Sequence, residues 1–568
     1  MWMDRLTTLL LLSAMAFGMG GFATAFVGHD RRSPLRSTVR ELEKTTWSPY
    51  AVKQPSSSST GLQMNALGIQ KAILGCRGGA TKIASPMSLL NGWNQTPQTL
   101  FNSSFIALAM VIITTKFVNA RTSLRQSDAS ASAKKPSTVA SLQRRFLPVF
   151  WLLRISDWLQ GPYFYEVYAS KILQGGKSVS MDLVSKLFLT GFASTALFGP
   201  AVGRAADQYG RKKATIAFTA LYALGALSTK SVFLQVLFMG RILSGIGTSL
   251  LFSAPEAWLV GASQANNREH GDDPEGKYLG ETFGLAYSGD SLVAIAAGQM
   301  AAWAASTSAG PTGPFLLSTI FLALGGLLTS VLWKENKAET VNAASDSSPS
   351  IRDAVKVVAK DPKILFVGGV QSLFEAAMYI FVLQWPPALS SAISKFFASR
   401  GATTATPYGT VFSCFMACCL LGSTLFGQVT GKMAVPTEHF TMGMLSVATA
   451  AMTVATMAVS GVTTTASSTL AALIASFFAF EACVGMYFPS IGTLRSKYVP
   501  DTHRSVIMNL FGIPLNVLVV SVFLSINKLG LKGALSISSL ALGLATLCMA
   551  GLDRIFVLES KSKASESS

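Results

Sequence analysis

Seven ionisable side chains lie inside long apolar stretches of this 568-residue sequence. They are Arg154, Asp157, Arg241, Glu256, Asp290, Glu375 and Glu481. A charge near the centre of a lipid bilayer costs roughly 2.5–3.5 kcal/mol on insertion scales, so each of them needs a reason. Such residues bind a ligand, carry a proton or pair with one another within a membrane.

Arg241 is the candidate ligand for an anion, because it falls well inside an apolar stretch over 232–259. A tetrahedral dianion needs positive charge together with several N–H or O–H donors, which a guanidinium supplies. The alternative is a structural pairing of Arg241 with Asp157, Asp290 or Glu256. The sequence alone leaves both interpretations open.

A second group of candidates opens the first apolar stretch of the main bundle. Arg154 and Asp157 are three residues apart and share a helix face, and Gln160 and Tyr163 continue a polar, aromatic surface. We place all four on the substrate path. The alternative is that Arg154 and Asp157 form a local ion pair that merely allows the helix to insert.

Glu375 and Glu481 are the candidate proton carriers, and Asp290 and Glu256 are further candidates. A carboxyl group in a dry cavity can bind and release a proton during a transport cycle. The alternative is that these acids form hydrogen bonds between helices. Five of the seven buried charges are acids, an excess that is awkward for an anion carrier.

These side chains must be positioned by membrane helices, because apolar runs of spanning length alternate with short polar links from residue 148 onward. Proline within such a run, as at Pro386, Pro489 and Pro514, predicts a broken or kinked helix. The order is six helices, a long polar link over 334–363 and six more helices. The expected helices cover 148–169, 185–204, 213–229, 232–259, 280–305, 314–333, 364–389, 408–428, 438–460, 468–491, 505–527 and 532–555.

The composition agrees with a membrane protein and excludes other classes. Half of the residues are hydrophobic and only 13% are charged, against about 25% in soluble domains. This excludes an ordinary soluble enzyme and a disordered protein. The net charge of +18 is typical of loop charge that orients a membrane protein, so we expect no nucleic-acid partner.

Basic residues are distributed unequally between the two sets of links. Links 2–3, 4–5, 6–7, 8–9 and 10–11 carry 16 Lys and Arg, and the opposite links carry 8. By the positive-inside rule, the first set faces the cytoplasm or its equivalent. We call that side of the bundle the basic end. The two termini of the bundle then lie there too.

One link carries a recognisable motif. Link 2–3 contains Gly203, Asp207, Gly210, Arg211 and Lys212 in the spacing G-x-x-x-D-x-x-G-R-K. A glycine at 203 allows two helices to approach, and a glycine at 210 permits a tight turn. The string resembles the loop signature of the major facilitator superfamily, in which this loop locks the two halves during alternating access.

Longer strings narrow the resemblance to the molybdate-anion transporter branch of that superfamily, over about residues 148–555. The resemblance implies the major facilitator fold, a small inorganic anion as substrate and no cofactor. The strings are Asp157–Tyr163, Leu250–Trp258 (where Pro255 predicts a kink beside Glu256), Gln371–Glu375 with Trp385-Pro386, Phe412–Met416 and Glu481–Pro489. The segment Arg241–Gly247 is similar to the R-x-x-x-G-x-G element of the superfamily as a whole.

The region before the bundle has a different composition. Residues 1–25 are predicted to be a signal peptide, and Phe26 with a basic, Ser-rich segment over 26–100 resembles a bipartite plastid transit peptide. The alternative is an ordinary signal peptide followed by a disordered tail, with the protein in a plasma or internal membrane. An additional helix over 101–119 and a basic linker over 120–147 follow.

The sequence therefore predicts an all-α, multi-pass secondary transporter, monomeric in the lipid bilayer. Two six-helix halves cover 148–333 and 364–555, and a disordered tail covers 556–568. We expect it to move molybdate or a related oxyanion by alternating access, with coupling to protons. The alternatives are another solute, such as a sugar or an organic anion, or a membrane sensor that does not transport. No enzymatic motif and no metal-site spacing is present, so we expect no catalytic activity and no metal.

Overall fold

The computed structural model is a helical bundle in two halves. It describes residues 96–127, 135–271, 277–337, 351–433, 435–463, 465–500 and 504–566. The predicted signal peptide, and the predicted transit segment up to residue 95, lie outside these ranges. Within them, α-helices and short helical turns supply all the regular elements, as the sequence predicts.

The first half contains six membrane helices, two of which are broken. Helix 1 is broken at a 3-10 turn over Gly161–Tyr163, and helix 4 is broken at Phe252 and Ser253. In order along the chain, the elements are α6 (Ser137–Trp158) with α7 (Phe164–Ala169), α8 (Met181–Tyr209), α9 (Arg211–Ser228), α10 (Leu234–Leu251) with α11 (Ala254–His270), α12 (Lys277–Ala305) and α13 (Gly313–Leu332).

The second half repeats the pattern after a link that contains a short helix. The elements are α14 (Ile351–Lys360) in the link, then α15 (Pro362–Ala398), α16 (Tyr408–Phe426), α17 (Thr437–Val459), α18 (Ala466–Tyr498), α19 (Arg504–Leu524) and α20 (Ile526–Glu566). The sequence predicted no helix in the link. Helix α14 forms because Val357 and Val358 pack against the buried core of the bundle.

Nine helices of the described chain are long and apolar enough to cross a membrane. One of them is the additional helix α5 (Pro97–Ser127), and eight belong to the two halves. The remaining four positions are filled by α6 with α7, α9, α12 and α19, which are shorter or more polar. Together they give the twelve-helix bundle with an additional N-terminal helix that the sequence predicts.

Proline has different effects at different positions. Pro255 lies in the first turn of α11, directly after the break in helix 4, as predicted. Pro386, Pro489 and Pro514 instead lie inside the continuous helices α15, α18 and α19, so the helices are not broken there, and the alternative of a simple kink stays a prediction. Neighbouring helices in a membrane bundle can satisfy the backbone groups that such a proline frees.

The last helix is longer than the sequence predicts. Helix α20 continues to Glu566, past the expected end at residue 555. Ion pairing between Lys363 and Glu559 (2.8 Å) ties this extension to α15. Phe556 gives it an apolar contact with His439 of α17.

The additional helix α5 packs on the second half. Leu100 and Phe101 are buried, and the Gln98 side-chain amide donates to the Thr410 hydroxyl of α16 at 3.0 Å. The helix therefore belongs to the described bundle through its contacts with α16.

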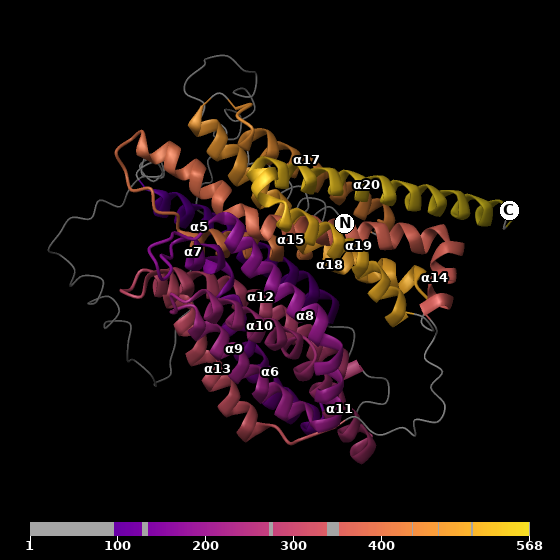
Figure 1. Cartoon of the computed structure of the whole chain (residues 1–568). Helices are drawn as coiled ribbons and strands as arrows, with labels where there is room; N and C mark the ends of the chain where they lie inside the picture. The colour runs from indigo at the N-terminus through magenta and orange to yellow at the C-terminus, as the bar shows by residue number, and fades with distance from the viewer. Residues whose placement is uncertain are drawn as a thin grey trace, which may run out of the picture.

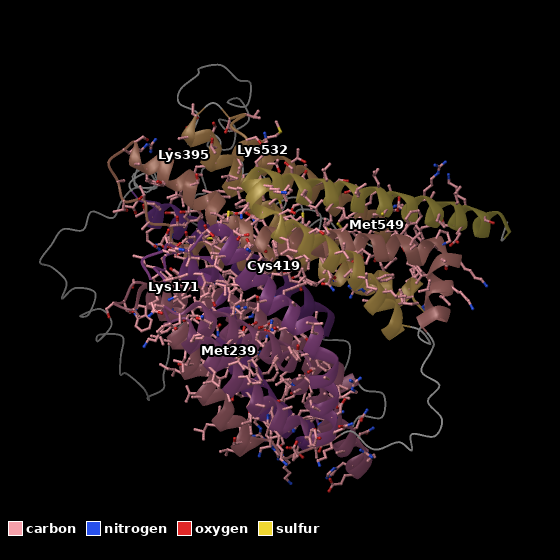
Figure 2. The ribbon with its side chains drawn as sticks, viewed as in Figure 1. Lys171, Met239, Lys395, Cys419, Lys532 and Met549 are labelled. Carbon is pink, nitrogen blue, oxygen red and sulfur yellow. The ribbon has the colours of Figure 1, made fainter. Side chains whose placement is uncertain are left out.

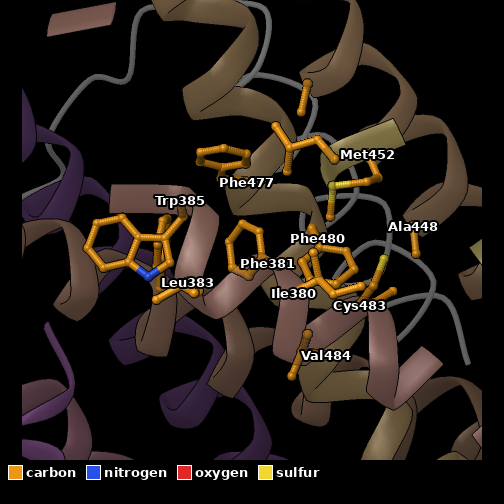
Figure 3. Close-up of a cluster of buried hydrophobic side chains, with 14 of the residues drawn as sticks. Ile380, Phe381, Leu383, Trp385, Ala448, Met452, Phe477, Phe480, Cys483 and Val484 are labelled. Carbon is orange, nitrogen blue, oxygen red and sulfur yellow. The ribbon is translucent and has the colours of Figure 1, made fainter. Parts of the chain in front are cut away.

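The larger buried cluster joins residues of both halves, and a second, smaller cluster lies within the first half. Aromatic rings stack in the first half, where Trp258 and Trp333 lie 4.0 Å apart at the basic end. The core of the second half lies between α15, α17 and α18 and includes Phe381, Phe477 and Phe480 (Figure 3).

The two halves meet at the end opposite the basic end. Helices α12 and α16 pack together, and Phe188 of α8 contacts Phe523 of α19. Lys171, Lys395 and Lys532, which the sequence analysis counted in the links of that end, all lie away from α11 and α14 (Figure 2). From there the halves diverge toward α11 and α14 (Figure 1).

Candidate functional site

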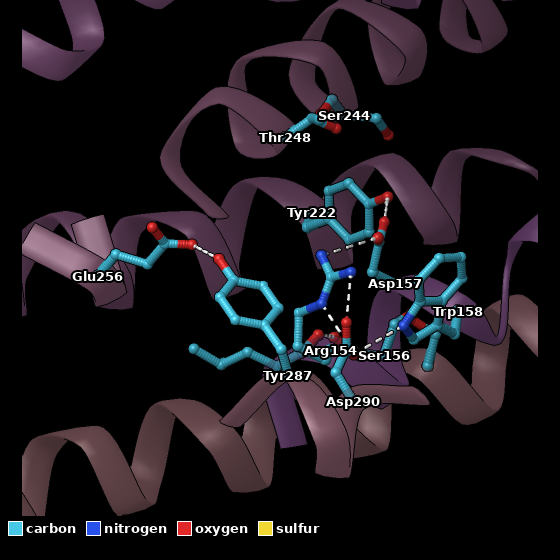
Figure 4. A network of polar contacts seen from close by, with 12 residues as sticks. Arg154, Ser156, Asp157, Trp158, Tyr222, Ser244, Thr248, Glu256, Tyr287 and Asp290 are labelled. Atoms are coloured by element: carbon cyan, nitrogen blue, oxygen red, sulfur yellow. Dashed lines mark hydrogen bonds and ion pairs between the residues drawn. The ribbon is translucent and has the colours of Figure 1, made fainter. Parts of the chain in front are cut away.

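The centre of the first half is a network of charged and aromatic side chains (Figure 4). Arg154 of α6 makes two hydrogen bonds to Asp290 of α12, from Nε at 3.0 Å and from Nη2 at 2.8 Å. The Trp158 indole also donates to Asp290, at 2.8 Å. Both charged side chains are more than nine-tenths buried. This is a bidentate pair that neutralises a buried arginine.

Asp157 lies on the same face of α6, one helical turn after Arg154 (Figure 4). It accepts a hydrogen bond from the Tyr222 hydroxyl of α9, and its second oxygen is 3.9 Å from Arg154. The local pair of Arg154 and Asp157 is therefore weaker than the pair of Arg154 and Asp290. Arg154 is already committed to these acids, which argues against its predicted role as a substrate ligand.

Arg241 has no such partner. It lies on α10, and its guanidinium carbon is 4.6 Å from the centre of the Phe164 ring. No ion pair of Arg241 is found within the described ranges, although Asp157 and Tyr222 lie close enough for its charge to act on them. The three structural pairings that the sequence left open, with Asp157, Asp290 or Glu256, are not formed.

Buried polar atoms without hydrogen-bond partners lie at and near Arg241. Its Nε atom is buried with no hydrogen-bond partner in the described structure, and so is the hydroxyl of Tyr168. Tyr168 lies near Arg241, so the two groups can serve one ligand. A methyl group added at Gly191 would lie 2.7 Å from Arg241 Nη2, so this glycine leaves room for the guanidinium. Tyr168 was missed by the sequence analysis, because nothing in the spacing sets it apart from other buried tyrosines.

The remaining candidates of the first half have other partners. Glu256 accepts a hydrogen bond from the Tyr287 hydroxyl. Gln160 is buried and donates to the Ser318 hydroxyl of α13 at 2.9 Å, so its amide joins two helices and does not extend the path. Tyr163 is buried and packs edge-on against Tyr408 of the second half.

In the second half, Glu375 has an arginine partner that the sequence analysis missed. Arg495 of α18 donates from Nη2 to Glu375 of α15 at 3.1 Å, and from Nε to Gln371 at 3.0 Å. The Tyr487 hydroxyl donates to the same Glu375 oxygen at 2.9 Å. Arg495 lies in the last turn of α18. From the sequence it is therefore assigned to the basic link that follows and not to the membrane interior.

Glu481 is the acid without a partner. It is 7% exposed, and its Oε2 atom has no hydrogen-bond partner in the part of the chain that the structure describes. Its neighbours include Cys418 and Cys419 of α16. A buried carboxyl group in such surroundings is stable only when it is neutral.

The predicted gate loop forms a clasp at the basic end. Asp207 pairs with Arg211 at 2.9 Å, and Gly210 has a φ of 125°, a conformation that favours glycine. The backbone N–H of Lys212 donates to Glu335 at 2.9 Å, which joins this loop to the end of helix 6. Glu335 was missed, because its role depends on two segments that are distant in the sequence.

Gly203 does not have the predicted role. A side chain at this position would meet no atom within 4 Å, so Gly203 does not mark a close approach of helices. Close crossings instead involve glycines outside the motif. Gly298 of α12 and Gly409 of α16 are in contact where the two halves meet.

No group of three or more His, Cys, Asp or Glu side chains that could hold a metal ion occurs in the described ranges. The five cysteines within those ranges are free. The candidate site therefore consists of arginines, acids and hydroxyl groups.

Comparison with known proteins identifies the group to which this arrangement belongs. Residues 100–484 match the model of a family described as sugar transporters with twelve transmembrane segments. The chain is 30% identical over 429 residues to a molybdate-anion transporter of Takifugu rubripes, covering 70% of this chain and 82% of that protein. It is 29% identical over 450 residues to a protein of the same name in Xenopus tropicalis, covering 74% and 90%.

Solved structures show the same fold at low sequence identity. A D-xylose–proton symporter is similar with a TM-score of 0.55 and 14% identity, covering 73% of this chain and 97% of that chain. A bacterial homologue of ferroportin in the inward-facing state gives 0.53 and 12%, covering 72% and 98%. At these identities the likeness concerns the fold alone.

Proposed function

This chain belongs to the major facilitator superfamily of multi-pass membrane transporters, and we propose that it carries a tetrahedral oxyanion such as molybdate. The observation that carries the proposal is Arg241, a cation without a carboxylate partner within the described chain, beside the unpaired hydroxyl of Tyr168. The names of the relatives from two vertebrates support the same substrate class.

The chemistry of the site favours an anion over a sugar. Arg241 Nε and the Tyr168 hydroxyl are donors that lack an acceptor, and an oxyanion supplies acceptors on every face. A sugar is the second candidate, because the description of the matching family names sugar transporters. A sugar hydroxyl neutralises no charge, so it would leave Arg241 unpaired.

Alternating access is the proposed transport mechanism. Aromatic contacts between the halves, such as Phe188 with Phe523 and Phe192 with Tyr379, lie toward the end opposite the basic links. This supports a state that is closed there and open toward the cytoplasmic side. Release of the Glu335 clasp and its re-formation would accompany the change of state.

Residues 1–100 are proposed to deliver the protein to a plastid envelope. The proposal rests on the basic, Ser-rich composition that follows Phe26. A fluorescent fusion of the full chain should locate to plastids, and a fusion that lacks residues 1–100 should not. An unchanged location after truncation would contradict the proposal.

Direct binding of molybdate to the purified full chain tests the substrate. We expect saturable binding that sulfate weakens and xylose does not. Arg241→Gln should reduce the affinity by at least about tenfold, since a charge-assisted hydrogen bond is lost. Arg400→Gln is the matched control, because Arg400 also lies over a phenylalanine ring (4.1 Å from Phe396) but is exposed. Equal affinities of the two variants for molybdate would show that Arg241 is not a ligand of the anion.

A further inference from the structure

The second half contains an arginine that, unlike Arg241, is paired with a carboxylate. Arg495 is fully engaged by Glu375 and Gln371, at 3.1 and 3.0 Å, and Tyr487 supports the same Glu375 oxygen. The side chain of Arg495 reaches toward the middle of α18, as side chains of a helix do. Helices α15 and α18 lie side by side in the bundle (Figure 1).

The two halves carry similar sets of groups. Helix 1 has the acid Asp157 with a tyrosine donor, and Arg241 of helix 4 lies nearby. Helix 7 has the acid Glu375 with a tyrosine donor, and Arg495 of helix 10 binds it directly. Helices 7 and 10 are the counterparts of helices 1 and 4 in a fold built from two repeats. The two sets differ in one respect: Arg495 is paired with a carboxylate, and Arg241 has no carboxylate partner in the described ranges.

The Glu375–Arg495 pair is also more accessible than the structural pair of the first half. The side chains of Arg495 and Glu375 are 25% and 19% exposed, whereas those of Arg154 and Asp290 are 8% and 9% exposed. Water can therefore reach the pair in this state. An accessible pair can exchange partners at a lower desolvation cost than a fully buried one.

We propose that Glu375 is an internal counter-anion that occupies Arg495 until the transported oxyanion takes its place. This rests on the proposed oxyanion transport and adds a second ligand and a coupling ion to it. The oxyanion binds Arg495, Glu375 leaves and takes one proton from water on the loading side. On the other side the anion departs, the proton returns to water and Glu375 binds Arg495 again. One proton thus travels with each anion in the same direction.

The surroundings of Glu375 allow this exchange. Arg495 and Tyr487 face it from α18, and the charge of Glu375 also acts on Tyr379 of its own helix. Helix α19 contributes the Phe511 carbonyl, which accepts from Ser372, and α20 contributes the Ser538 hydroxyl beside Ala377. Arg495 is thus the cation that faces Glu375 in the described structure.

Proton uptake on ligand binding tests the proposal with the purified full chain and sodium molybdate. Calorimetric titrations in two buffers of different ionisation enthalpy give the number of protons bound with each anion. We expect roughly one proton per anion for the native chain and none for Glu375→Gln. Glu375→Gln should also bind molybdate about tenfold more tightly at alkaline pH, since the competing carboxylate is gone.

Glu559→Gln is the control, because it removes another carboxylate that pairs with α15, through Lys363 at 2.8 Å. This variant should keep the native proton uptake. Native binding without proton uptake, or the same uptake in Glu375→Gln, would overturn the proposal and leave oxyanion binding intact. Absence of molybdate binding in a folded native chain would instead contradict the proposed function itself, and this proposal with it.

Discussion

Most of the charged side chains within the helices have partners that account for their position. Asp290 neutralises the buried Arg154, and Glu375 neutralises the partly exposed Arg495, which the sequence analysis did not single out. Of the other acids that made an anion carrier awkward, Asp157 and Glu256 accept hydrogen bonds from tyrosine hydroxyls, and Glu481 keeps an oxygen without a hydrogen-bond partner in the described part of the chain. Arg241 is the cation that remains available within the described ranges.

Gly191→Ala tests the position of Arg241 without changing its charge. The added methyl group would lie 2.7 Å from Nη2 and must displace the guanidinium. We expect molybdate affinity to fall about tenfold while the melting temperature changes little, because the contact involves the end of a flexible side chain. Gly284→Ala is the control, since a methyl group there meets nothing within 4 Å. Unchanged affinity in Gly191→Ala would argue against this placement.

Asp290→Asn tests whether the pair with Arg154 is structural. The change leaves a buried guanidinium without its main counter-charge and should lower the free energy of unfolding by about 3 kcal/mol. Glu281→Gln removes the exposed pair with Lys135, whose side chains are 41% and 33% exposed, and should cost less than about 1 kcal/mol. Denaturant titration in detergent measures both. Similar losses in the two variants would contradict a structural role for Asp290.

Among the helices, the crossing of α12 with α16 is a main contact between the two halves. Gly298 and Gly409 are in contact, and the Ser413 hydroxyl donates to the Ile295 carbonyl at 2.8 Å. Tyr408 in the first turn of α16 adds a hydrogen bond to Glu166 of α7 at 3.1 Å. Small residues permit such a close crossing in membranes, where packing replaces the hydrophobic effect.

Gly409→Leu should therefore open this end of the transporter. A side chain at 409 would lie 2.6 Å from the Ala302 backbone nitrogen, which cannot move aside. Spin labels at the exposed positions Lys177 and Lys395, one in each half, should move apart in this variant. Gly443→Leu on α17, where a side chain meets nothing within 4 Å, is the control. An unchanged label distance in Gly409→Leu would show that the crossing does not set the gate.

The sequence predicts the number and order of the helices because hydropathy and loop charge are local properties. It does not predict where they break. Pro255 marks a break, but Pro386 lies within a continuous helix, because neighbouring helices decide whether the freed backbone groups are satisfied. Partners such as Glu335 for the Lys212 backbone N–H depend on contacts across the bundle, which local spacing does not encode.

At the scale of the whole molecule, aromatic side chains of the two halves are in contact at the end opposite the basic end. Phe188 and Phe523 lie with ring centres 5.1 Å apart, and they join α8 to α19. The halves diverge toward the basic end (Figure 1). For a transporter that alternates between two such states, holding this end shut must stop the cycle.

A cysteine pair at Phe188 and Phe523 tests this directly. In a background without the native cysteines, oxidation should form a disulfide across the closed end and stop uptake, and a reductant should restore it. Phe188→Cys alone should be unaffected by oxidation. Transport that continues after complete cross-linking would contradict alternation at this end.

Uptake of molybdate into proteoliposomes that contain the full chain tests the central claim most directly. The account predicts saturable uptake that sulfate inhibits, that Arg241→Gln abolishes and that Arg400→Gln preserves. Uptake of xylose in place of molybdate, or molybdate uptake no greater than in protein-free vesicles while the inserted protein is folded, would contradict it.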